Sequence, residues 1–115
     1  MKNYLAIFLG SAAAMDAYRA MPEAKRKEND VKGMQAWMQW VEKHRDHLVD
    51  MGSPLGKTKK IDKKGVSDIR NEVGAWTLVK AESHEEAAAM FKNHPHFTLF
   101  PGDSVEVMEC LDIPT

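Results

Sequence analysis

The sequence predicts one α+β domain whose elements follow the order strand, long helix, strand, strand, short helix, strand. Three observations support this prediction: an unbroken apolar run over residues 4–9, apolar residues at helical spacing over residues 30–51, and a helix-capping motif at residues 83–86. Two βαβ units in this order form a four-stranded antiparallel sheet with both helices on one face, the ferredoxin-like arrangement.

Composition limits the classes of protein to consider. A chain of 115 residues has the size of one domain, so we expect a single unit over residues 1–115. The formal net charge of −1 gives no overall attraction to nucleic acid or to an anionic membrane. Cys110 is the only cysteine, which excludes an internal disulfide and favours a reducing, cytoplasmic compartment. The short apolar start leaves a secretory signal as a minor alternative.

The first thirty residues begin with the apolar run 4–9, which is typical of a strand covered on both faces. Ser11 can cap a short helical turn, which Pro22 would interrupt. Residues 23–30 have mixed charge, and we expect either a solvated helix face or a mobile loop there.

The long helix is predicted over residues 30–51, with Asp30 as its N-cap and Gly52 as its stop signal. Apolar and histidine side chains recur there at spacings of three and four, which would place them on one face. These residues are Met34, Trp37, Met38, Val41, His44, Leu48 and Met51.

The second half of the chain alternates strand and turn signals. Residues 55–61 predict the second strand, residues 62–65 a turn, residues 73–81 the third strand and residues 104–111 the last. Ser83 and Glu86 form a capping box that opens the short helix, which ends at residues 93–95. Five lysines make the hairpin around the turn basic, and they either block edge-to-edge association or form an anion-binding rim. They are Lys57, Lys59, Lys60, Lys63 and Lys64.

The strands carry apolar residues on both faces. The third strand, for example, directs Ala75 and Val79 to one face and Trp76 and Leu78 to the other. A bare apolar sheet face of this size is unusual on a monomer. We therefore expect a two-fold homodimer in which a second copy covers this face.

Three stretches, in their order and spacing, resemble the YCII-related domain family, small bacterial proteins of the dimeric α/β barrel superfamily. They are HLVDMGSPLG at 47–56, GAWTLVKAESHEEAAAMF at 74–91 and NHPHFTLFPGDSVEVMEC at 93–110. The resemblance implies a ferredoxin-like sheet, a homodimer, and cofactor-independent acid/base chemistry of the isomerase or lyase type on a small organic molecule. The competing function is a non-catalytic module that binds a small molecule or acts as an accessory dimer.

The chain departs from the family at its functional positions. Trp40 and Val41 occupy the helix region where family members carry a histidine. His94 precedes Pro95 where many members have an aspartate, and residues 66–71 lack the Asp-Gly-Pro-Phe signature of some relatives. No catalytic role therefore transfers by position.

The residues themselves suggest a candidate site. His44 and His94 are the candidate acid/base groups, because imidazole titrates near neutral pH, although each also fits a hydrogen-bonded core position. His96, Trp40 and Asp103 are candidate ligand-binding residues.

The histidines also raise the possibility of a metal site. They form two pairs at the spacing of metal ligands, but zinc needs three or four ligands, so we predict neither a metal nor a cofactor. The pairs are His44 with His47 and His94 with His96.

Overall fold

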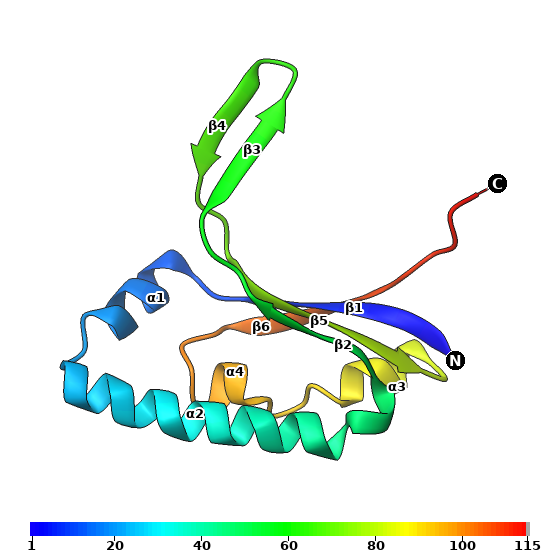
Figure 1. Cartoon of the computed structure of the whole chain (residues 1–115), viewed down its shortest axis with the longest axis horizontal. Helices are drawn as coiled ribbons and strands as arrows, with labels where there is room; N and C mark the ends of the chain where they lie inside the picture. The colour runs from blue at the N-terminus through cyan, green and yellow to red at the C-terminus, as the bar shows by residue number, and fades with distance from the viewer. Residues whose placement is uncertain (115) are drawn as a thin grey trace.

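The computed structural model describes residues 1–114 and places its helices on one face of a four-stranded antiparallel sheet (Figure 1). The strand order across the sheet is β2-β5-β1-β6. This arrangement confirms the predicted ferredoxin-like α+β fold. The strands are β1 (Lys2–Leu9), β2 (Leu48–Pro54), β5 (Val73–Ala81) and β6 (Ser104–Glu109).

The central strand β1 determines where the core lies. It pairs antiparallel with β5 on one side and with β6 on the other. Because side chains alternate along a strand, Tyr4, Ala6 and Phe8 point to the helix side, where all three are buried. Leu5 and Ile7 point to the opposite face, which no helix covers (Figure 1).

Three helices lie on the helix side of the sheet, α2 (Glu23–Lys43), α3 (His84–Ala89) and α4 (Pro95–Thr98), whereas α1 (Ala12–Arg19) lies beyond the end of β1 and leads into α2 (Figure 1). The predicted cap of α1 is confirmed, since the Ser11 hydroxyl accepts a hydrogen bond from the Ala14 amide at 3.1 Å. The longest helix, α2, lies so close to Phe100 that a Cβ atom at Gly33 would overlap its ring.

The predicted bounds of the long helix were wrong at both ends. The helix runs over residues 23–43 rather than 30–51, so the charged segment 23–30 is its solvated first part. After α2, a short 3-10 turn η1 (Arg45–His47) leads into β2, and Leu48 pairs with Val79 of β5. This pairing has two irregularities, one between Leu48 and Asp50 and one between Asp50 and Ser53. On α2 itself, Met34 and Met38 are about half exposed, at 52% and 49%.

The predicted second strand was also displaced. Residues 48–54 take its place in the sheet, whereas β3 (Thr58–Asp62) and β4 (Gly65–Ile69) form a separate hairpin. This hairpin rises from the sheet on the side opposite the helices (Figure 1). Its turn lies where predicted: the Asp62 carboxylate accepts a hydrogen bond from the Lys64 amide at 2.8 Å, and Gly65 has a positive φ.

The third strand and the start of the short helix were predicted correctly, whereas the predicted end of that helix at residues 93–95 was wrong, because α3 ends at Ala89. β5 covers the predicted residues 73–81, and the Ser83 hydroxyl accepts a hydrogen bond from the Glu86 amide at 3.1 Å. The Glu86 carboxylate accepts from the Glu82 amide rather than from that of Ser83, so the capping box is only half formed. Within residues 1–114, every helix is too short or too polar to cross a membrane.

Gly52 provides a test of this fold, because it has φ +75 and lies against the backbone of Trp76. We expect Gly52→Ala to lower the free energy of unfolding by about 2 kcal/mol or more, since a Cβ atom there would collide with the Trp76 carbonyl group. The measurement is urea unfolding followed by circular dichroism. Gly56→Ala is the matched control, because a Cβ atom at Gly56 meets no atom within 4 Å. Equal stability of the two variants would contradict the register of β2 against β5.

Candidate functional site

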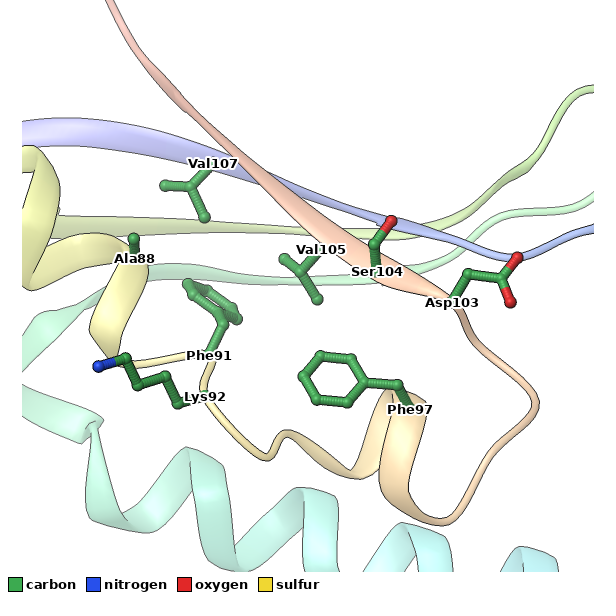
Figure 2. Close-up of a pocket in the computed structure, with 8 residues that line it drawn as sticks. All are labelled: Ala88, Phe91, Lys92, Phe97, Asp103, Ser104, Val105 and Val107. Atoms are coloured by element: carbon green, nitrogen blue, oxygen red, sulfur yellow. The ribbon is translucent and has the colours of Figure 1, made fainter.

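A shallow groove of about 420 Å³ lies between β6 and the segment that carries α3 and α4 (Figure 2). Its walls are mostly apolar, and its two charged residues stand at opposite ends in Figure 2, Lys92 at one end and Asp103 at the other. The lining residues are Ala88, Phe91, Lys92, Phe97, Asp103, Ser104, Val105 and Val107.

The strands β6 and β1 position the apolar walls of the groove and the Asp103 carboxylate. Alternation along β6 directs Val105 and Val107 to the helix side, where they face the groove. The Asp103 amide donates a hydrogen bond to the Leu9 carbonyl at 2.9 Å, and its carboxylate oxygen Oδ2 accepts from the Ser11 amide at 2.8 Å. The end of β1 therefore fixes the orientation of the Asp103 carboxylate at the rim of the groove.

His94 lies behind the groove and is completely buried. Its Nδ1 accepts a hydrogen bond from the His96 amide at 3.0 Å, so it caps α4 and carries its proton on Nε2 when neutral. Nε2 is buried without a hydrogen-bond partner among residues 1–114. Burial first, then the neighbouring His96 and His44, lowers the pKa of His94 to about 3. Four aromatic rings surround it: Phe8, Trp37, Trp40 and Phe91.

His96 is nearly buried and faces β1 rather than the groove. Its Nε2 donates a hydrogen bond to the Leu9 carbonyl at 2.8 Å, the same carbonyl that accepts from the Asp103 amide. Burial lowers the pKa of His96, and the hydrogen bond to Leu9 partly offsets this effect. A Cβ atom at Gly102 would overlap the imidazole ring, so the turn before Asp103 is packed tightly on His96. The structure thus brings His96 and Asp103 together at the end of β1.

Trp40 lies between His44 and His94. Its ring centroid is 4.8 Å from each of the two imidazoles, and its indole N–H donates to the Met90 carbonyl at 2.7 Å. His44 follows the last residue of α2 and is partly exposed, and its pKa is lowered by burial first and then by Lys43 and His47. None of His44, Trp40 and His94 is among the residues that line the groove, and the acid/base role of the two histidines stays a prediction.

The His47 side chain makes its hydrogen bond to the sheet, although its backbone amide donates to the His44 carbonyl at 2.9 Å. It lies on η1, beyond the end of α2, and donates from Nδ1 to the Lys80 carbonyl at 3.0 Å. Among residues 1–114, no three histidine, cysteine or acidic side chains are grouped closely enough to hold a metal ion.

Most of the groove residues were not singled out from the sequence. Only Asp103 was among the candidate ligand-binding residues, while Phe97 and Lys92 carry no motif. One usable signal was the alternation of Val105 and Val107 on the last strand, opposite the short helix α3 and the turn after it that carries Phe91. The groove arises from the packing of α4, whose position the sequence pattern did not predict.

Comparisons with known proteins support the fold. No protein-family model matches the chain, and no curated protein matches it. Among solved structures, 5-chloro-2-hydroxyhydroquinone dehydrochlorinase (TftG) from Burkholderia phenoliruptrix AC1100, in complex with 2,5-dihydroxybenzoquinone, is similar, with 16% sequence identity and a TM-score of 0.54. The match covers 91% of this chain and 89% of that chain. The chain therefore shares with this structure the fold of an antiparallel sheet covered by helices on one face.

The buried His94 predicts how stability depends on pH. With a pKa of about 3 when folded and 6.5 as the reference value, the unfolded chain binds more protons between these limits. This contribution to stability is complete above pH 6.5 and is lost as the pH falls toward 3. We expect the free energy of unfolding to fall by roughly 1.4 kcal/mol per pH unit within this window because of His94. Urea unfolding at a series of pH values measures it.

His94→Asn isolates this effect, because asparagine can still accept from the His96 amide but does not titrate. The variant should be less stable at pH 7, and its stability should fall less steeply with acid than that of the wild type. His84→Asn is the control for substitution of an exposed histidine; because it also removes the hydrogen bond of His84 Nε2 to the Val107 carbonyl, the slopes with pH, and not the stabilities at pH 7, are compared. A His94→Asn curve parallel to the wild-type curve would mean that His94 is not buried in its neutral form.

Proposed function

We propose that the protein binds a small, largely apolar organic molecule in the β6–α3–α4 groove and converts it by cofactor-independent acid/base chemistry of the isomerase or lyase type. One observation carries this proposal: apolar walls lie between two residues of opposite charge, the exposed Lys92 and the hydrogen-bonded Asp103. Sites for small molecules commonly combine apolar walls with a few well-placed polar groups.

Asp103 is the one carboxylate among the residues that line this groove, which makes it the candidate for moving a proton. A general base must be held within hydrogen-bond reach of its substrate, and the Ser11 amide holds the Asp103 carboxylate in position. His94, by contrast, is sealed in the core, and a pKa of about 3 leaves it neutral at physiological pH. In this proposal His94 and His96 position the loop, and Asp103 handles the proton.

The proposed reaction begins with transfer of a proton to the Asp103 carboxylate from a ring carbon that is joined to a carbonyl group through a carbon–carbon double bond. The electron pair of the broken C–H bond moves through that double bond to the carbonyl oxygen as a dienolate, whose charge the Lys92 ammonium group stabilises. Return of the proton from Asp103 to the carbon beside the carbonyl group shifts the double bond and completes an isomerisation. The TftG structure, an enzyme with a bound hydroxylated quinone, supports a single-ring substrate of this kind for the present fold.

A non-catalytic binding protein is the second candidate function. The observation that favours it is the burial of the two histidines of the 94–96 loop, His94 and His96, which keeps both imidazoles from the groove. This candidate shares the groove and its ligand with the first, and it differs only in the absence of a proton transfer.

We also propose that two copies pair through their open sheet faces. Leu5 lies opposite Leu78 and Met108, and Ile7 lies opposite Trp76, so apolar side chains continue across three strands on this face. A second copy related by a two-fold axis would remove these side chains from water.

We further propose a family and a location for the protein. The order of the stretches 47–56, 74–91 and 93–110 supports membership of the YCII-related family, and the lone Cys110 supports a cytoplasmic location.

Phe97 tests the groove as a binding site. We expect Phe97→Ala to weaken binding of 2,5-dihydroxybenzoquinone about tenfold, because it removes one aromatic wall, roughly 1.4 kcal/mol. Titration followed by amide chemical shifts gives the dissociation constant and shows whether Phe91 and Val105 respond. Met34→Ala, on the outer face of α2, is the control and should bind like the wild type. Shifts confined to residues outside the groove would refute the site.

Asp103 tests the chemistry separately. We expect the wild type to catalyse exchange of carbon-bound hydrogen for deuterium in D2O on a panel of single-ring hydroxyquinones and cyclic ketones. Asp103→Asn should bind the same molecules and lose at least a hundredfold in exchange rate, because the amide can accept from the Ser11 amide but cannot take up the proton. Exchange is followed by proton NMR. Equal rates in both proteins would exclude Asp103 as the base, and binding without any exchange would favour the non-catalytic function.

A further inference from the structure

The hairpin of β3 and β4 stands apart from the rest of the molecule. β2 and β5 are antiparallel neighbours, which a turn of two to five residues commonly joins, yet residues 55–72 intervene. The hairpin rises clear of the sheet (Figure 1) and contributes to a radius of gyration of 15.9 Å, against roughly 13 Å for a compact domain of this length. Such a long insertion with its own secondary structure requires a physical explanation.

The hairpin lacks a core of its own. A two-stranded hairpin alone is at best marginally stable in water. Ile61 and Val66 lie opposite each other on one of its faces and are 73% and 66% exposed. The Lys59–Asp68 ion pair on the same face, at 2.7 Å, is also exposed and adds little stability. The apolar pair is therefore placed where only another molecule can cover it.

The charge of the hairpin is opposite to that of the rest of the chain. Five lysines and two aspartates give residues 57–69 a formal charge of +3, so the remainder of the chain, which totals −1, carries −4. Glu106 is exposed on β6, the strand at the opposite edge of the sheet from β2, and it lies opposite Ile7 and therefore on the open face. A second copy of this chain thus offers an acidic surface to the basic hairpin.

The hairpin points to the side of the sheet on which the second copy would lie. It rises on the open side of the sheet, and residues 110–114 leave the other end of the sheet on the same side (Figure 1). The proposed homodimer places a second copy on this open face, between the two extensions. We infer that the β3–β4 hairpin is an exchanged arm, which packs its Ile61–Val66 pair and its lysines against the second copy. This inference rests on the proposed sheet-to-sheet dimer and adds a contact to it.

The test compares dimer dissociation constants by sedimentation equilibrium. We expect the double substitution Ile61→Glu with Val66→Glu to raise the dissociation constant at least tenfold, because it places two carboxylates where the arm is buried. The arm lies outside the core, so far-ultraviolet circular dichroism and the thermal midpoint of the dilute monomer should stay unchanged. Met34→Glu with Met38→Glu is the control, since these side chains are exposed on the helix side, and its constant should stay within twofold of the wild-type value.

Hydrogen exchange gives a direct second readout. Amides of residues 58–69 should exchange at least tenfold more slowly in the dimer than in the monomer. A wild-type dimer that is unaffected by the arm substitutions, with equally fast exchange at every protein concentration, overturns the arm while leaving the sheet dimer intact. A wild type that stays monomeric overturns both proposals. Loss of heparin binding in the arm variant, with an unchanged dimer, would assign the arm to a polyanion instead.

Discussion

Phe8 is the side chain on which the helix side of the sheet is assembled. Its ring centroid lies 5.1 Å from that of Trp37, 5.0 Å from that of His94 and 5.2 Å from that of His96. The central strand β1, the long helix α2, and α4 with its capping residue His94 therefore all contact this one side chain. A shift of one residue in the register of β1 would move Phe8 to the open face. The groove depends on this packing, because α4, whose His96 contacts Phe8, also places Phe97 in the wall of the groove.

Burial of His94 has a cost in free energy and a consequence for the path of the backbone. Burial of an N–H group without a partner costs about 1–3 kcal/mol, whereas a helix cap restores about 1 kcal/mol. The remaining cost is offset by the contacts of the imidazole with the surrounding aromatic rings. As a result, the backbone from His94 to Asp103 is held at three points. The helix α4 begins at Pro95, the His96 side chain donates a hydrogen bond to the Leu9 carbonyl at the end of β1, and Gly102 packs against the His96 ring. The Asp103 carboxylate is held at the rim as a consequence.

Local signals predicted those elements whose ends are set by local chemistry. The caps at Ser11 and Ser83 and the strand at residues 73–81 were found because hydroxyl caps and β-branched runs act over a few residues. The end of α2 was missed because residues 44–51 keep a helical spacing, and only pairing with β5, more than twenty residues away, makes 48–54 a strand. The groove was missed for the same reason. Lys92 and Phe97 acquire their positions from α3, α4 and β6 together, and a histidine pattern cannot show whether the imidazoles face the core or the solvent.

The exposed apolar residues of the chain differ in what their exposure implies. Met34 and Met38 are flexible side chains on a helix that is already anchored by Trp40, and single exposed methionines on such a helix are ordinary. Ile61 and Val66 are β-branched residues on a hairpin that has no core of its own. Because both side chains are exposed, the hairpin gains little stability from the burial of apolar surface. The open sheet face is intermediate, because each strand there is already held by the core on the other side. The hairpin is therefore the part of the fold that would gain most stability from a covering partner, while the groove on the opposite side of the sheet is formed by residues of one chain.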